Sequence, residues 1–146
     1  ILLTKELDEN NPREGLLRSL ASGQLGRRWP KDDEFERAWV IYRAYSNPTD
    51  RCRFILESLE RAHPHKEPAS FENISIEHIL PQTPSEDWHR DLGPTTEAQR
   101  EAWAHTIGNL TLTAYNPELS NASFTRKKVI YAESHFMLNR HFESLA

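Results

Sequence analysis

The chain has 146 residues, with 18 Lys and Arg against 22 Asp and Glu, and a formal net charge of -4 at pH 7. This length predicts a single domain. The charge excludes a protein that holds nucleic acid by overall basicity, so such binding needs a local basic patch, a metal or a partner domain. No apolar run approaches the ~20 residues of a transmembrane helix, which excludes a membrane-spanning protein.

The cysteine content and the first residues of the chain bear on its cellular location and on its place in the gene product. Cys52 is the single cysteine in the sequence, which excludes an intramolecular disulfide and a cysteine-based zinc cluster. We therefore expect a reducing, cytoplasmic location. Residues 1–5 lack Met, a basic segment and an apolar segment, so they do not resemble a signal peptide. We expect a chain that begins inside a longer gene product.

The first 62 residues have the apolar spacing of helices. Three leucines predict a short helix from about residue 12 to 23, closed by glycines. Aromatic and aliphatic residues from Phe35 to Tyr45 recur at helical spacing and predict a second helix. Asn47, followed by a proline, is a plausible N-cap of a third helix. Residues 1–62 therefore predict a helical lead-in.

The apolar period then changes from 3.6 residues to two. Isoleucines alternate over residues 74–80 and predict a short strand that ends at Pro81. Residues 109–113 predict a second strand by alternation and β-branching. Between the strands, residues 83–106 contain two sequences typical of capping boxes, which predict an insert of two short helices.

The last part of the chain returns to helical spacing. A helical element is predicted from about residue 119 to 131, and a terminal helix over 134–146. The predicted fold class is therefore α+β and mainly α, a helical domain that encloses a small strand–insert–strand–helix unit over residues 74–131.

Glu77 and His78 place a carboxyl group beside an imidazole near the end of the first predicted strand. Neighbours on a strand face opposite sides, so a shared role requires a bulge or twist at the strand end. A carboxylate is a ligand that Mg²⁺ prefers. An imidazole can act as a general base because its pKa lies near working pH.

Three asparagines follow the acid–histidine pair. Asn109 opens the second predicted strand, where its amide can orient the imidazole or the turn. Asn116 and Asn121 lie at the entry to the next helix, where an amide oxygen can complete a metal site without adding negative charge. Asparagines at such positions are otherwise turn and cap residues. His105 is close in sequence to Asn109 and can face the same site, although a partly packed surface role is the simpler expectation.

The motifs that carry a family resemblance are three blocks of sequence. They are Ile-Glu-His-Ile-Leu-Pro-Gln over 76–82, Ile-Gly-Asn-Leu-Thr-Leu over 107–112, and a spaced series, Asn116, Leu119, Ser120, Asn121, Phe124 and Lys127. Together they resemble the HNH (His-Me finger, ββα-metal) nucleases. They look most like the nuclease domain at the C-terminus of GmrSD-type type IV restriction enzymes and related phage-defence proteins. The resemblance covers residues from about 25 to 143.

The resemblance implies a role for each matching residue. His78 corresponds to the histidine that deprotonates water, Glu77 to the acid that ligates the metal, and Asn109 to the residue that supports the loop and the base. A third position on the finger helix, another metal ligand, is filled by Asn121 or Asn116. We favour Asn121 because it lies where the predicted helix starts. Glu77 has a longer side chain than the aspartate that is common at this position in the family.

The resemblance also implies a substrate, a cofactor and partners. It indicates hydrolysis of DNA with Mg²⁺ or Mn²⁺, and it places a short basic patch against the phosphate, made of Arg126, Lys127 and Lys128. It implies a sensor domain in an N-terminal part of the same protein, outside this chain, that directs the nuclease to phage or modified DNA. Two alternatives stay open: a catalytically silent relative that binds DNA or a partner protein, and a nuclease that acts on RNA.

Overall fold

The computed structural model describes residues 11–22, 28–46, 48–64, 69–93 and 97–144. Contacts divide the chain into two compact units, Ile1–Ala38 and Trp39–Ala146, and each is described by itself. Within the described residues, no helix combines the length and the apolar character that crossing a membrane requires. In chain order the elements are α1 (Pro12–Ser22), α2 (Asp32–Val40), α3 (Asp50–Ala62), β1 (Ser75–His78), α4 (Glu86–Leu92), α5 (Glu97–Ala104), β2 (Leu110–Thr113), α6 (Asn116–Leu119), α7 (Phe124–Ala132) and α8 (Met137–Arg140). This mainly helical arrangement with one small sheet confirms the predicted fold class.

In the first unit, the predicted helix over 12–23 is α1, and its start is capped. The side-chain oxygen of Asn11 accepts a hydrogen bond from the Glu14 backbone at 3.4 Å, and Asn11 Nδ2 donates to the Glu14 carboxylate at 3.0 Å. These two bonds satisfy groups that the first turn leaves unpaired. The glycines predicted to close this helix lie outside the described residues.

The second predicted helix is shorter than its apolar spacing indicated. Helix α2 ends at Val40, so the prediction of a helix through Tyr45 is wrong. The backbone after Val40 pairs instead with a distant segment: Ile107 N donates to Tyr42 O at 3.2 Å, and Tyr45 N donates to His105 O at 3.3 Å. These long-range hydrogen bonds replace the helical ones. Helix α3 then begins at Asp50, and the predicted cap, Asn47, lies outside the described residues.

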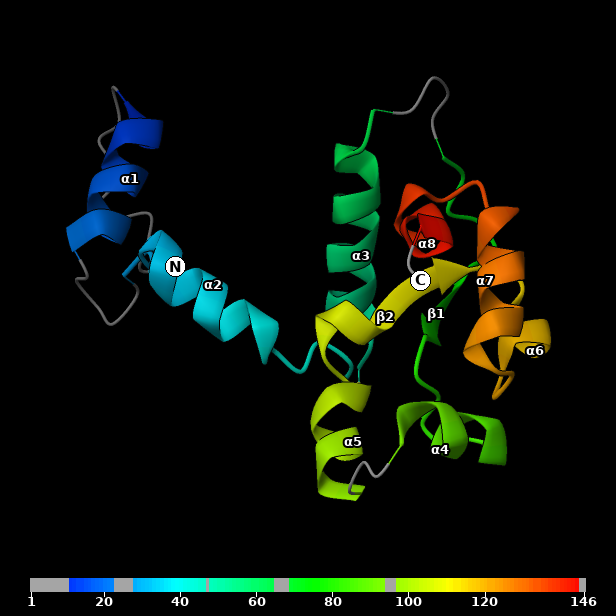
Figure 1. Ribbon diagram of the computed structural model, residues 1–146. Helices are drawn as coiled ribbons and strands as arrows, with labels where there is room; N and C mark the ends of the chain where they lie inside the picture. The colour runs from blue at the N-terminus through cyan, green and yellow to red at the C-terminus, as the bar shows by residue number, and fades with distance from the viewer. Residues whose placement is uncertain (1–10, 23–27, 47, 65–68, 94–96, 145–146) are drawn as a thin grey trace. The chain divides into compact units, whose positions relative to one another are not determined.

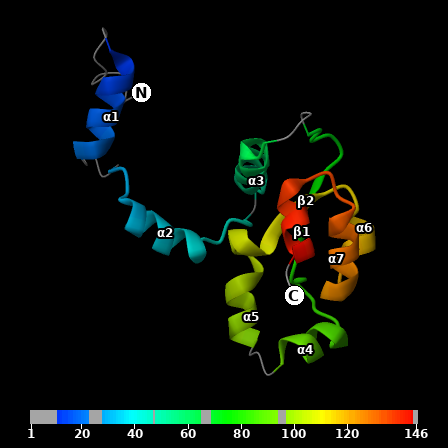
Figure 2. The same ribbon diagram turned by 45° about the horizontal axis from the view of Figure 1, so that its top comes forward.

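Strands β1 and β2 form an antiparallel ribbon. Its register pairs Ser75 with Thr113 and His78 with Leu110. In both Figure 1 and Figure 2 the ribbon lies between α3 on one side and the α6–α7 pair on the other. The predicted first strand was longer, because its alternation continued to residue 80. The chain leaves the ribbon at residue 79, where its backbone turns around Asn109.

The main core lies where the ribbon meets the surrounding helices. It contains the buried residues Ala44, Cys52, Leu56, Ile74, Ile107, Leu110, Leu112 and Phe136. Burial raises the pKa of the Cys52 thiol to about 11, so this cysteine is an unreactive core residue. Glu60, itself buried, accepts hydrogen bonds from the backbone of Met137 at 2.7 Å and Leu138 at 3.0 Å. This carboxylate fixes the start of α8 against α3.

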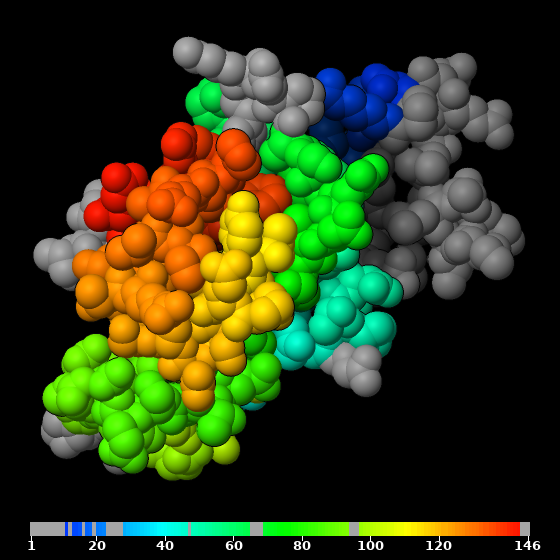
Figure 3. Space-filling model, turned by 90° about the vertical axis from the view of Figure 1, so that its right-hand side faces the viewer, coloured from blue at the N-terminus to red at the C-terminus, as the bar shows by residue number. Residues whose placement is uncertain are grey.

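The two short helices of the insert pack near one end of the ribbon. Trp88 of α4 donates its indole hydrogen to Ala122 O at 2.7 Å, and its ring lies 5.9 Å from that of Phe124. Figure 3 shows the resulting continuous surface, with α4 in green beside α6 and α7 in orange tones. The predicted capping box starting at Thr83 is wrong, because α4 begins at Glu86 with Ser85 at the cap position.

After β2 the chain forms two helices, α6 and α7, where one element was predicted. Between them Ser120 has a φ of 32°, a backbone conformation that residues other than glycine rarely adopt. This turn ends α6 and directs the chain into α7. The predicted terminal helix over 134–146 is reduced to α8 and a 3₁₀ turn, His141–Ser144.

Candidate functional site

A cleft of about 310 Å³ opens beside the end of β1. It is lined by residues of β1, the loop that follows, α6 and the next turn, together with Tyr45: Tyr45, Ile76, Glu77, His78, Pro81, Gln82, Thr83, Asn116, Ser120 and Asn121. The structure therefore brings four of the predicted site residues to one cavity, namely Glu77, His78, Asn116 and Asn121.

His78 is the last residue of β1 and is only 7 % exposed. Its Nε2 lies 3.3 Å from Nδ1 of His105, and its ring meets the Tyr45 ring edge-on, with centroids 4.5 Å apart. Burial, with smaller contributions from nearby His105 and Lys127, lowers the pKa of His78 from its ordinary 6.5 to about 4. The imidazole is therefore neutral at pH 7 and able to accept a proton.

Glu77 precedes His78 in β1 and lines the same cleft, and its carboxylate is paired with a lysine of α7. Its Oε1 lies 2.5 Å from Nζ of Lys127, which also donates to the His78 carbonyl oxygen at 2.8 Å. Both side chains of this ion pair are buried. Burial raises the pKa of the Glu77 carboxyl, and the Lys127 ammonium opposes that shift. The pair fastens α7 to the end of β1.

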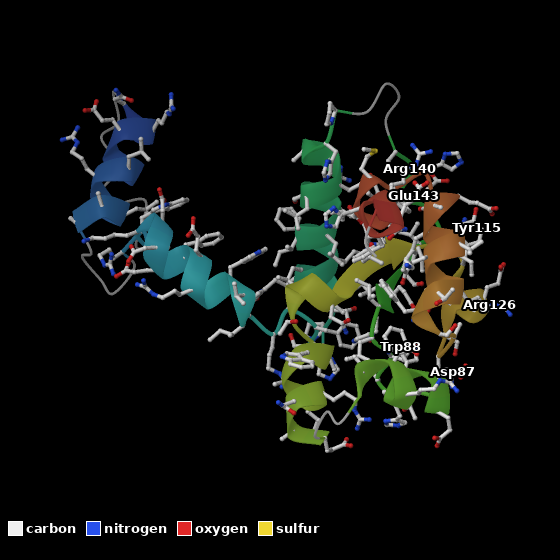
Figure 4. The ribbon with its side chains drawn as sticks, viewed as in Figure 1. Asp87, Trp88, Tyr115, Arg126, Arg140 and Glu143 are labelled. Atoms are coloured by element: carbon white, nitrogen blue, oxygen red, sulfur yellow. The ribbon has the colours of Figure 1, made fainter. Side chains whose placement is uncertain are left out.

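This placement corrects the predicted basic patch. Lys127 is fully buried and hydrogen bonded, so it does not present its ammonium to a phosphate as the sequence predicted. Nζ of Lys128 lies 5.4 Å from the centre of the Phe124 ring, and this lysine is half-buried. Arg126 is exposed, and Figure 4 places it on the outer side of α7.

Asn109 does not line the cleft but holds the loop that follows His78. Its Oδ1 accepts from Leu80 N at 2.7 Å, while its Nδ2 donates to Leu80 O at 3.0 Å and to Ala104 O at 2.9 Å. Its own carbonyl oxygen accepts from Ile79 N at 2.9 Å. These bonds place Asn109 as a clamp on the loop, and among the described residues its amide makes no hydrogen bond to the imidazole of His78.

Asn116 and Asn121 lie at opposite ends of the short helix α6 and the turn after it. Asn116 is the first residue of α6 and is half-buried. Asn121 is exposed and lies before α7, whose N-cap is Ser123, so the expectation that Asn121 starts the helix is wrong. Since both line the cleft, both amides remain candidates for the third position.

Two residues of the site carried little signal in the sequence. His105 had only its closeness to Asn109 to indicate a role, and Tyr45 was assigned to a helix. The structure places both against His78, and His105 also lines a second cavity of about 280 Å³ that shares Gln82 with the cleft. The missing information was the pairing of the Tyr45 segment with residues 105–107, which joins distant parts of the chain.

The side-chain atoms that line the cleft can be compared with the ligands that a divalent cation prefers. Among the described residues, no group of three or more His, Cys, Asp or Glu could hold a metal, which does not suit a closed zinc site. The cleft offers one carboxylate, from Glu77, and the amide oxygens of Asn116 and Asn121. Mg²⁺ commonly takes one or two carboxylates and completes its shell with water and substrate phosphate, so these hard oxygen donors fit it.

Comparison with known proteins gives the family of the chain. The family model for the C-terminal domain of GmrSD restriction endonucleases matches residues 29–146, which include every residue that lines the cleft. No curated protein and no solved structure matches the chain. The matched region is well over half of the sequence and contains the ribbon, its insert and the helices around it. The chain therefore belongs to the family of C-terminal domains of GmrSD restriction endonucleases, a nuclease family of restriction systems.

Proposed function

We propose that this domain is a metal-dependent DNA endonuclease of the HNH type and that His78 is its general base. The observation that carries the proposal is a neutral imidazole fixed at the edge of a cleft that also contains Glu77, Asn116 and Asn121. A base and a set of hard oxygen donors at one cavity are what phosphodiester hydrolysis requires.

In the proposed reaction His78 accepts a proton from a water molecule that attacks phosphorus. The new bond between water oxygen and phosphorus forms as the bond to the 3′ oxygen breaks, and the 3′ oxygen takes a proton from solvent. Mg²⁺ or Mn²⁺, held by Glu77 with Asn121 or Asn116, would stabilise negative charge on the phosphate. Asn109 holds the loop after His78 in place.

Capture of DNA is proposed to depend on more than this domain. Arg126 is the exposed member of the predicted patch, and Lys128 is half-buried, so we propose both as phosphate contacts of modest strength. The net charge of -4 provides no general attraction for DNA. We therefore propose that an N-terminal domain of the same cytoplasmic protein supplies the selection of phage or modified DNA.

One observation favours a second candidate function, a silent domain that binds DNA or a partner protein. Lys127 already occupies one oxygen of Glu77, and this buried ammonium repels a cation at the same carboxylate. A silent domain would bind without cleaving, which the following experiment detects.

The test is relaxation of supercoiled plasmid DNA with Mg²⁺, Mn²⁺ or EDTA. Loss of a general base typically costs 10²–10⁴-fold, so we expect His78→Ala to lower the cleavage rate by about that factor while DNA binding persists. EDTA should abolish cleavage by the unchanged protein. His135→Ala, at an exposed histidine, is the matched control and should cleave normally. Undiminished cleavage by His78→Ala would overturn the assignment, and metal-independent binding without cleavage by the unchanged protein would support the silent domain.

A further inference from the structure

The His78 ring has a neighbour that none of the motif blocks contains. His78 Nε2 and His105 Nδ1 are 3.3 Å apart, and the two rings meet nearly at right angles, with an interplanar angle of 79°. Neither atom can both donate and accept, because a neutral imidazole carries one proton on one of its two nitrogens. One ring therefore donates to the other, and the direction of this bond decides which nitrogen of His78 is free to act as a base.

His105 is fixed in place from two sides. Its ring stacks on that of Tyr45, with centroids 5.5 Å apart and planes within 13°. The backbone nitrogen of Tyr45 donates to the His105 carbonyl at 3.3 Å, and a bridge joins Arg43 to Thr106. On the other side, Asn109 donates to the Ala104 carbonyl at 2.9 Å. Asn109 thus joins the residue before His105 to the loop that follows His78.

We propose that His105 is a positioning residue that keeps the ring proton of His78 on Nε2 and leaves Nδ1 unprotonated. This inference rests on the proposed function, in which His78 removes a proton from water. Since Nε2 is engaged by His105, Nδ1 is the nitrogen that remains for the substrate water. A base at Nδ1 requires the ring proton on Nε2, donated to His105 Nδ1, and the proton of His105 on its own Nε2.

The first test reads the tautomer directly and needs no activity. Long-range ¹H–¹⁵N correlation spectra of ¹⁵N-histidine-labelled, metal-free protein at pH 7 distinguish protonated from unprotonated ring nitrogens. We expect His78 with a protonated Nε2 and an unprotonated Nδ1, and the reverse arrangement for the two nitrogens would overturn the proposal. The assignment of the His78 signals comes from their disappearance in the spectrum of His78→Gln.

The second test separates hydrogen bonding from packing with two variants of His105. His105→Phe keeps a ring against Tyr45 and removes the acceptor, whereas His105→Asn removes the ring and offers an oxygen near the position of Nδ1. We expect kcat for plasmid relaxation to fall about tenfold in the Phe variant, the size of one hydrogen bond, with KM unchanged. The Asn variant should recover most of that loss. A normal kcat in the Phe variant together with a loss in the Asn variant would indicate a packing role only and would overturn the proposal.

Controls keep this inference separable from the proposed function. His135→Phe changes an exposed histidine and should leave kcat unchanged. Urea unfolding of each variant checks that the fold is retained. If His78→Ala cleaves normally, the proposed function fails. If His78→Ala is inactive while His105→Phe keeps full kcat, the proposed function stands and the role of His105 fails.

Discussion

At the scale of single residues, the ion pair of Glu77 and Lys127 changes how the motif is understood. A glutamate beside the proposed catalytic histidine resembles a metal ligand, yet its charged partner is an ammonium on α7 at 2.5 Å. Two buried opposite charges gain little over an apolar pair, but either one left alone is costly, because its desolvation is no longer compensated. The pair therefore couples the position of Glu77 to the docking of α7.

This coupling predicts the result of a double-mutant cycle. Lys127→Met leaves a buried carboxylate unpaired, and Glu77→Gln leaves a buried ammonium unpaired, so each is expected to lower the free energy of unfolding by about 3–5 kcal/mol. The double variant should lose clearly less than the sum of the two. Urea denaturation followed by circular dichroism measures all three values.

An exposed pair provides the control for this cycle. Asp33 and Arg37 lie 2.9 Å apart on α2 with side chains more than half exposed, and such surface pairs are worth about 0–1 kcal/mol. Asp33→Asn should therefore change the unfolding free energy little. Strict additivity of the Glu77 and Lys127 substitutions would mean that the buried pair is not coupled.

The family resemblance implied that Lys127 faces a phosphate, whereas Lys127 is buried, and the reason for the difference is physical. Lysine is mostly exposed in proteins, and its partner here lies 50 positions earlier in the chain. A helical spacing of four residues links Lys127 to buried Tyr131, which indicates that both lie on the inner face of α7. Only the tertiary structure reveals the carboxylate that makes this burial possible.

At the scale of elements, the ribbon and its flanking helices were predictable, whereas their ends were not. Alternation correctly indicated both strands, but the first one stops at His78 because Asn109 bends the chain after it. Trp39, Tyr42 and Tyr45 have helical spacing, and all three pack against the main core. Trp39 lies in α2, whereas Tyr42 and Tyr45 lie in the nonhelical segment that follows it. Local spacing cannot distinguish these cases when the deciding hydrogen bonds come from a segment about 60 residues away.

Asn109 gives a prediction at this scale because its side chain joins the loop after β1 to the end of α5. Asn109→Asp introduces a side chain of nearly the same shape but removes the amide that donates both hydrogen bonds. The carbonyl oxygens of Leu80 and Ala104 then lose the hydrogen bonds that they accept from this side chain. We expect a loss of about 1–3 kcal/mol in unfolding free energy, the cost of buried unsatisfied groups. Cleavage of plasmid DNA should also slow, since the backbone beside His78 is less firmly held.

The matched control is the same substitution at an exposed turn. Asn73 lies in the turn before β1 with a φ of 55°, a conformation that aspartate also tolerates. Asn73→Asp should therefore unfold and cleave as the unchanged protein does. Equal behaviour of the Asn109 and Asn73 variants would show that the clamp contributes nothing to the site.

At the scale of the whole molecule, the sequence predicted a mainly helical fold with one ribbon, and four of the site residues that it predicted line a single cleft. It could not predict the burial that sets the properties of the site. Composition indicates which groups titrate, but the pKa of each depends on the water that the complete fold removes from around it. The neutral state of His78 is therefore a property of the packed molecule.

This neutral state predicts how the stability of the whole fold depends on pH. The pKa of His78 is about 4 in the folded protein and near its ordinary 6.5 in the unfolded chain. Between these values the unfolded chain binds more protons, so the contribution of His78 to stability is present above pH 6.5 and is lost as the pH falls to about 4. Urea midpoints of metal-free protein should therefore fall over this range, and the fall should be smaller in His78→Gln. His135→Gln, at an exposed position, should follow the unchanged protein, and parallel curves for all three proteins would contradict a neutral, buried His78.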